Sequence, residues 1–115
     1  MKLSQTLLRQ LGIHATHKGY HYLLASLEMA LEDEKNLVLY SKMLFPTVAR
    51  KHHSTPSRVE RDIRTAIAHC WNCPGKEKLE RITPYTLYKQ PSLGEFIDIL
   101  YWHLKFLEEK NETTY

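Results

Sequence analysis

The sequence of 115 residues has few cysteines and few glycines, and it contains no long apolar run. Cys70 and Cys73 are the only cysteines, which are too few for a disulfide framework and fit a reducing compartment. No segment approaches the roughly 18 consecutive apolar residues that span a bilayer, and residues 1–12 lack the continuous apolar core of a signal peptide. We therefore expect a protein of the cytoplasm that has no membrane partner.

The signatures of enzymes and metal sites are also missing. The seven histidines are scattered, and neither a carboxylate pair nor a glycine-rich nucleophile turn accompanies them. Cys70 and Cys73 form a lone C-x-x-C pair, whereas a structural zinc site needs four ligands, usually from two such pairs. Cys70 also belongs to an apolar stripe, so we interpret it as a core residue. We expect no enzymatic activity, no cofactor, no metal and no small-molecule substrate.

Apolar residues recur with a period close to 3.6 along the whole chain, and no strand pattern competes with this period. The pattern predicts helices over residues 3–11, 18–33, 37–44, 46–51, 56–71 and 93–109, with a short helical turn over 77–82. The helix over 37–44 should end at the Phe45-Pro46 step, because a residue before proline resists the α conformation. We expect one compact, all-α, six-helix domain over residues 1–115, with its core at about 3–109.

Residues 45–67 have the pattern of a helix-turn-helix, in which the second helix enters the major groove of DNA. A polar turn at His52, His53 and Ser54 joins two predicted helices, and His53 takes the position where glycine is often found. Thr55 is a suitable N-cap and Pro56 a suitable first helical residue. The second helix carries one apolar stripe that must face the core, made of Val59, Ile63, Ala66, Ile67 and Cys70.

The basic excess of the chain is confined to this segment. Between Arg50 and Arg64 there are five Lys/Arg and two Asp/Glu, a local net charge of +3 that equals the net charge of the whole chain. The outward face of the second helix mixes arginine with Glu60, a combination suited to bases because arginine pairs with guanine and glutamate accepts from cytosine. A solvated face with ion pairs such as Glu60–Arg64 is an equally open alternative on this evidence.

Several blocks of the sequence, spread over about residues 5 to 108, carry a resemblance to a known family. The most specific are His17-Lys18-Gly19-Tyr20 and Ser57-Arg58-Val59-Glu60-Arg61, and further matches lie at residues 11–13, 42–51 and 95–97. With these blocks the sequence resembles the C-terminal DNA-binding effector domain of the master response regulator of endospore formation in Firmicutes, the stage 0 sporulation protein A family.

The resemblance implies a sequence-specific transcription regulator whose recognition helix, at about residues 56–71, reads a short G-rich promoter box in the major groove. The base-reading residues would be Arg58, Glu60 and Arg61. The residues that contact the DNA backbone or support the readers would be Lys51, Ser57, Arg64 and Thr65. The resemblance also implies double-stranded DNA with tandem boxes as the target, a dimer on DNA, and RNA polymerase as a further partner.

The sequence departs from the family pattern in three places. Asp62 stands where the family has a small residue, and Thr65 stands where it has histidine. The segment 72–90 diverges most. In addition, 115 residues leave no room for the receiver domain that normally precedes the effector domain, so the chain is either part of a longer protein or a stand-alone regulator without a phosphorylation switch.

These departures keep a second function open. The domain could be a protein-interaction module that has lost specific DNA binding and pairs with a full-length regulator or with RNA polymerase. Tyr101 and Trp102 adjoin the apolar stripe of the last helix, so at least one of them should reach the surface, where an aromatic side chain can anchor a protein partner.

Overall fold

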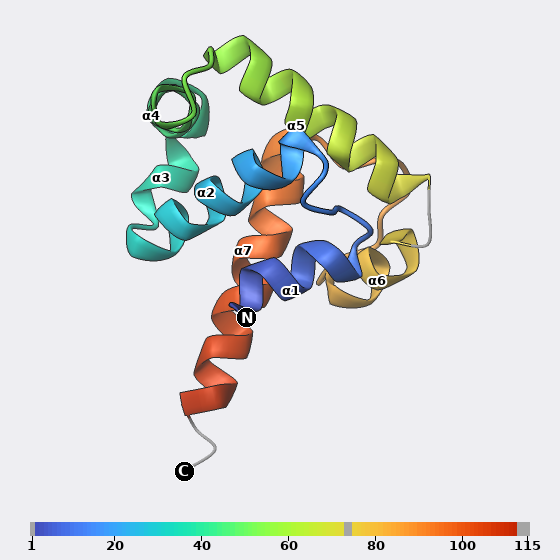
Figure 1. Ribbon diagram of the computed structural model, residues 1–115. Helices are drawn as coiled ribbons and strands as arrows, with labels where there is room; N and C mark the ends of the chain where they lie inside the picture. The colour runs from blue at the N-terminus through green and yellow to red at the C-terminus, as the bar shows by residue number, and fades with distance from the viewer. Residues whose placement is uncertain (1, 73–74, 113–115) are drawn as a thin grey trace.

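The computed structural model describes residues 2–72 and 75–112, and every regular element in these two ranges is helical (Figure 1). In chain order the elements are α1 (Leu3–Gln10), α2 (Lys18–Glu32), α3 (Lys35–Val38), the π-helix η1 (Tyr40–Leu44), α4 (Phe45–Lys51), α5 (Pro56–Trp71), α6 (Gly75–Ile82) and α7 (Leu93–Glu112). The all-α prediction is confirmed. Seven α-helices are described rather than six, because α3 is separate from η1 and α6 is a complete helix rather than a single turn.

Local sequence signals set several of the helix ends. Gly12 follows α1 with φ of +81°, a left-handed conformation that costs glycine nothing and ends the helix. The capping box expected before α7 is present: the Ser92 hydroxyl accepts from the Glu95 N–H at 3.2 Å, and the Glu95 carboxylate accepts from the Ser92 N–H at 3.0 Å. These ends were predictable because each depends on neighbouring residues alone.

The expected ordinary helix over 37–44 is wrong, because α3 and the π-helix η1 occupy this range. η1 does end at Leu44, but the chain stays helical through the step before proline. The Leu44 N–H donates to the Leu39 carbonyl five residues earlier at 3.3 Å, which is the wider spacing of a π turn. Phe45 is helical, with φ −67° and ψ −38°, and the helix continues through Pro46 in the first turn of α4. In a regular α-helix the ring of Pro46 would clash with the carbonyl four residues earlier. A π turn is wider than an α turn and so leaves more room for this ring.

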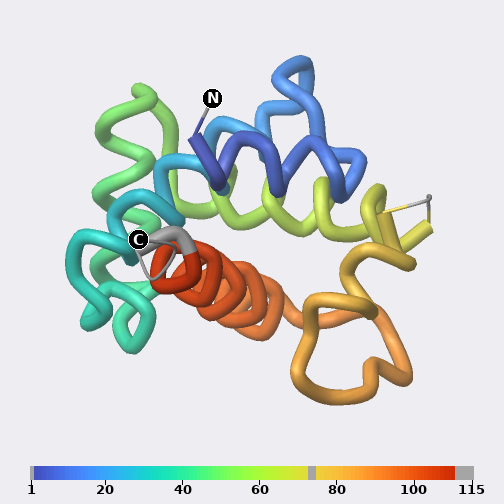
Figure 2. The backbone as a smooth tube through the Cα atoms, turned by 90° about the horizontal axis from the view of Figure 1, so that it is seen from below, coloured from blue at the N-terminus to red at the C-terminus, as the bar shows by residue number. Residues whose placement is uncertain are grey.

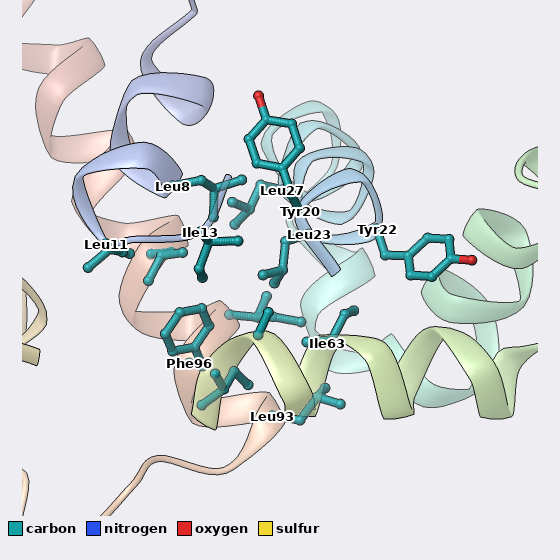
Figure 3. Packing of buried hydrophobic residues seen from close by; sticks show 14 of the residues in the cluster. Leu8, Leu11, Ile13, Tyr20, Tyr22, Leu23, Leu27, Ile63, Leu93 and Phe96 are labelled. Carbon is teal, nitrogen blue, oxygen red and sulfur yellow. The ribbon is translucent and has the colours of Figure 1, made fainter. Parts of the chain in front are cut away.

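The core lies where α2, α5 and α7 pack together. Figure 3 shows Leu23 of α2, Ile63 of α5 and Phe96 of α7 converging, and all three side chains are fully buried. Burying one such side chain stabilises the fold by about 1.5–3 kcal/mol. The predicted apolar stripe of α5 is confirmed, since each of its members is buried: Val59, Ile63, Ala66, Ile67 and Cys70.

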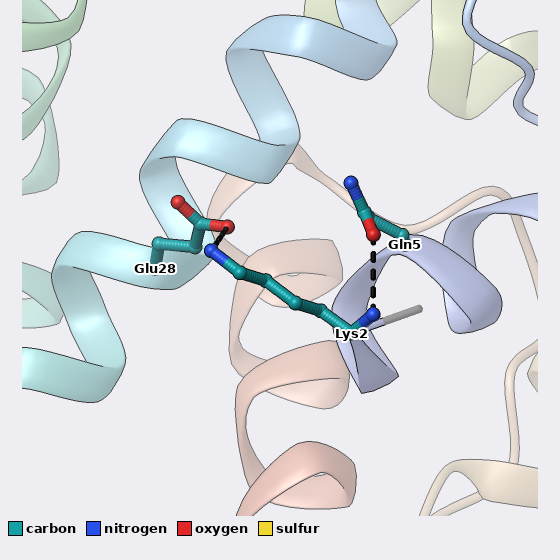
Figure 4. A network of polar contacts seen from close by, with 3 residues as sticks. All are labelled: Lys2, Gln5 and Glu28. Carbon is teal, nitrogen blue, oxygen red and sulfur yellow. Dashed lines mark hydrogen bonds and ion pairs between the residues drawn. The ribbon is translucent and has the colours of Figure 1, made fainter.

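The remaining helices are arranged around α7. Figure 2 looks nearly along α7 and shows α2 with segment 35–51 on one side of it and the α6 region on the other. At the surface, Lys2 ties the start of α1 to α2, because its Nζ lies 3.1 Å from Glu28 Oε1 while its backbone N–H donates to Gln5 Oε1 at 3.1 Å (Figure 4). Such an exposed pair contributes at most about 1 kcal/mol.

Within residues 2–72 and 75–112, no helix has the length and apolar character needed to cross a membrane.

Candidate nucleic-acid interface

The turn between α4 and α5 is tight and contains one left-handed residue. The Ser54 N–H donates to the Ala49 carbonyl at 2.8 Å, and the His53 N–H donates to the Arg50 carbonyl at 3.3 Å. These bonds satisfy carbonyls at the end of α4 that would otherwise lack a donor. His53 has φ of +53°, so it occupies the conformation for which glycine is best suited. The turn expected at residues 52–54 is confirmed.

The start of α5 is fixed by the residues that the sequence indicated. Thr55 is extended, with φ −120° and ψ 154°, and its Oγ1 accepts from the backbone N–H of Arg58 at 3.3 Å. Pro56 is the first helical residue. Ala49 and Val59 are both buried, and α4 packs against α5. The two helices and their turn therefore form one packed unit.

The outward face of α5 carries three exposed arginines. Arg58 is exposed, and the side chains of Arg61 and Arg64 are 67% and 64% exposed. Glu60 is less accessible, with 29% of its side chain exposed. This face lies opposite the buried stripe, and Figure 1 shows α5 along the outer edge of the molecule. Its cations are therefore available to a partner.

One groove runs beside the N-terminal half of α5 and is called the turn groove below. It has a volume of about 620 Å³. Three elements supply its basic lining, namely Lys18 and His21 of α2, His52 and His53 of the turn, and Arg58 and Arg61 of α5. The one carboxylate in its lining is Asp62. The turn groove therefore offers a predominantly cationic surface.

A second groove lies on the other flank of α5, with a volume of about 360 Å³, and is called the Glu60 groove below. Glu60 and Arg64 line it together with Tyr40 of η1 and with Gln90 in the segment before α7. Glu60 Oε2 lies 3.9 Å from Arg64 Nη2, so the ion pair of the alternative interpretation is present at the limit of contact. The structure thus divides the predicted readers, because Arg58 and Arg61 border one groove and Glu60 the other.

The predicted backbone-contacting residues are also spread out. Lys51 is exposed at the end of α4 and lines neither groove, and Ser57 is exposed in the first turn of α5. Thr65 is exposed, but its hydroxyl donates to the Arg61 carbonyl of its own helix at 3.0 Å. Within this set, Arg64 lines the Glu60 groove and Thr65 lines a third, smaller cavity beside Gly19. The four residues do not form one cluster.

Asp62 lies next to Arg61 on this face. Its Oδ1 lies 3.5 Å from Arg61 Nε, and only 18% of its side chain is exposed. The Asp62 carboxylate therefore lies beside the Nε edge of the Arg61 guanidinium. Asp62 therefore contacts Arg61, one of the predicted readers, directly.

Cys70 is buried in the α5 stripe, which confirms its interpretation as a core residue. Cys73, the second cysteine of the C-x-x-C pair, lies outside the described residues, as does Pro74. Within residues 2–72 and 75–112, no group of three or more His, Cys, Asp or Glu side chains could hold a metal ion.

Sequence reasoning overlooked Lys18. Gly19 is buried against α5, where a Cβ would collide with the Asp62 carbonyl oxygen and lie 2.8 Å from the Ala66 Cβ. The glycine therefore lets the first turn of α2 press against α5 and places the adjacent Lys18 in the turn groove. The signal in the sequence was a cation directly before a glycine at a helix start. The sequence did not show that this glycine packs against α5.

The family model described as sporulation initiation factor Spo0A C terminal matches residues 4–104. This match covers most of the chain and includes every residue that lines the two grooves. The family is the DNA-binding effector domain of the sporulation response regulator, and it is not a family of enzymes.

Proposed function

The chain belongs to the Spo0A C-terminal family, and on that premise we propose that it is a sequence-specific regulator of transcription whose α4, turn and α5 form a helix-turn-helix. In this proposal α5 enters the major groove of double-stranded DNA while α4 braces it from behind. The observation that carries the proposal is the outward face of α5, where exposed arginines and a half-buried glutamate lie opposite the buried stripe. A helix with this face, standing between two grooves, suits insertion between two DNA backbones.

Arg58, Glu60 and Arg61 are the proposed readers of bases. Each arginine can donate two hydrogen bonds to O6 and N7 of a guanine, and Glu60 can accept a hydrogen bond from the N4 amino group of a cytosine. Glu60 would only repel phosphates, so its presence on this face favours base contact over backbone contact. Together the three residues favour a G-rich box. Because Arg58 and Arg61 border the turn groove and Glu60 the opposite one, they would read neighbouring base pairs rather than a single pair.

Affinity would come mainly from phosphate contacts, which position a protein on DNA without reading sequence. We assign this role to Lys51, Ser57, Arg64 and Thr65. Arg64 already lies near Glu60, so DNA binding would exchange a weak surface ion pair for a charge-assisted bond to phosphate. Thr65 would act as a supporting residue, since its hydroxyl is engaged with its own helix.

The likeness to the family also underlies the finer features of the proposal. These are binding to tandem promoter boxes as a dimer, contact with RNA polymerase, and action in the cytoplasm where the bacterial chromosome lies. Comparing the affinity for tandem boxes with the affinity for a single box tests the dimer.

The test uses Arg58→Ala and Arg61→Ala with Arg9→Ala as a matched control, because Arg9 is exposed on α1. Binding is measured by fluorescence anisotropy on duplexes in which single base pairs of a G-rich box are replaced. Each α5 variant should lose about 1–3 kcal/mol on the intact box and should no longer discriminate at one base pair. If both variants keep full affinity and selectivity, the assignment of the reading helix is wrong.

One observation favours the second candidate, a protein-interaction module. Tyr101 is buried and its hydroxyl donates to Glu34 Oε1 at 3.1 Å, but Trp102 and Phe106 on the same helix are 51% and 57% exposed. The prediction that one of the two adjacent aromatics reaches the surface is thus confirmed. Salt dependence separates the candidates, since about five phosphate contacts give a log–log slope near −4 to −5. An apolar protein interface shows little salt dependence.

A further inference from the structure

The turn groove contains a strongly basic element that does not belong to the helix-turn-helix. Lys18 is exposed in the first turn of α2, more than thirty residues before α5 in the sequence, yet it lines the same groove as Arg58 and Arg61. A surface that joins cations from separate elements provides a continuous field, whereas a cation alone on a helix face is screened by solvent.

The close contact between α2 and α5 fixes this arrangement. Because Gly19 has no side chain, the first turn of α2 lies directly against the backbone of Asp62, and α2 is in contact with α5. Lys18 is therefore attached to a helix start that cannot move independently of the proposed recognition helix. Its position relative to Arg61 is a property of the core rather than of a loop.

The opposite wall of the groove is also held in place. The rings of Tyr22 and His52 meet edge to face with centroids 5.3 Å apart, so α2 contacts the turn as well as α5. Figure 3 shows Tyr22 projecting from α2 on the side away from Leu8 and Ile13, which leaves it available for this contact. His21 is tethered to its own preceding loop, with Nε2 2.7 Å from the Ala15 carbonyl oxygen. Lys18 and Arg58 are exposed in the lining, and Arg61 is exposed beside Asp62.

A DNA strand is the occupant that fits this geometry. A helix inserted in the major groove has a sugar–phosphate backbone along each flank, and the turn groove lies along one flank of α5. A lysine ammonium is a compact charge with three donors and suits a phosphate that needs no directional readout. Lys18 is far from Arg58 and Arg61 in the sequence, but the packing of α2 against α5 brings it into the same groove.

We propose that the Lys18 ammonium group binds a phosphodiester group of the DNA strand that borders the turn groove, a contact called the phosphate seat below. This makes α2 a second DNA-contacting element. This inference rests on the proposed function. Asp62 should weaken phosphate binding at this seat through charge repulsion, because it is the one carboxylate that lines the turn groove and it contacts Arg61. Removing the cation and removing the acid should therefore change DNA affinity in opposite directions.

The test compares Lys18→Gln and Asp62→Asn with the wild-type chain on the G-rich box and on a scrambled duplex across a salt series. Lys35→Gln is the control, because Lys35 is an exposed lysine on α3 that lines neither groove. Lys18→Gln should weaken binding to both duplexes equally and make the log–log slope less steep by about 1. The wild type should then lose roughly fourfold more affinity than the variant between about 50 and 200 mM salt.

Asp62→Asn should strengthen binding to both duplexes, and Lys35→Gln should leave the slope unchanged. An unchanged slope for Lys18→Gln, with wild-type preference for the box intact, would overturn the phosphate seat and leave the proposed function standing. If the wild type shows no preference for the box, the proposed function itself fails.

The same phosphate chemistry could be met by a free anion, so inorganic phosphate is titrated by NMR without DNA. Saturable shifts at Lys18 with an unchanged DNA slope would assign the groove to free phosphate and overturn the proposal.

Discussion

The hydroxyl of Thr55 accepts a hydrogen bond from the backbone N–H of Arg58 at 3.3 Å, so the residue that caps α5 also holds the backbone of the first proposed base reader. Thr55→Ala removes this bond and should lower the free energy of unfolding by about 1 kcal/mol. Thr55→Ser keeps a hydroxyl and should remain close to the wild type. Urea denaturation of the three proteins checks this, and equal stability of the alanine variant would show that the cap contributes nothing.

The left-handed turn residue gives a second prediction. His53 has φ of +53°, a conformation that costs residues with a Cβ roughly 1–2 kcal/mol and is worst for β-branched side chains. We therefore expect His53→Gly to be more stable than His53→Val by about 1–2 kcal/mol. Thermal unfolding of the two variants measures the difference. A valine variant as stable as the glycine variant would mean that the turn relaxes to another conformation.

Gly19 should tolerate no side chain. A Cβ there would collide with the Asp62 carbonyl oxygen and crowd the Ala66 Cβ at 2.8 Å, both of which belong to the rigid body of α5. Overpacking of this kind costs about 1–3 kcal/mol, so Gly19→Ala should be destabilised by that amount. Equilibrium unfolding in guanidinium chloride provides the measurement. Unchanged stability would contradict the close approach of α2 to α5 on which the turn groove depends.

The cap of α7 makes stability depend on pH. Hydrogen bonds from the backbone N–H and the side chain of Ser92 lower the pKa of Glu95 below its ordinary value of 4.5. The unfolded chain therefore binds a proton more readily than the folded chain, so this contribution is present above pH 4.5 and is lost as the pH falls through the folded-state pKa. Glu95→Gln should be less stable than the wild type near neutral pH, and the difference should shrink in acid. A constant difference across the pH range would contradict this origin.

Features that depend on neighbouring residues could be predicted from the sequence. The start of α5 followed from Thr55 and Pro56, and its buried stripe followed from the spacing between Val59 and Cys70. The turn at residues 52–54 followed from its polar composition. In each case the physical cause lies within a few residues, so no knowledge of packing was needed.

Features that depend on packing could not be predicted in this way. The π turn ahead of Pro46 contradicts the local preference of the residue before proline, and tertiary packing of the buried Phe45 accompanies it. The groove position of Lys18 depends on the contact of Gly19 with α5, which no periodicity reveals. The division of Arg61 and Glu60 between two grooves depends on η1 and on the segment before α7.

Specific DNA recognition is the central claim, and one binding measurement tests it most directly. Fluorescence anisotropy of the wild-type chain is recorded against a tandem G-rich promoter duplex and a scrambled duplex of the same composition, across a series of salt concentrations. We expect a preference for the promoter duplex of at least ~10³-fold, together with a steep salt dependence. Weak and equal binding to both duplexes would contradict the claim and would leave the outward face of α5 as a basic patch without a reading function.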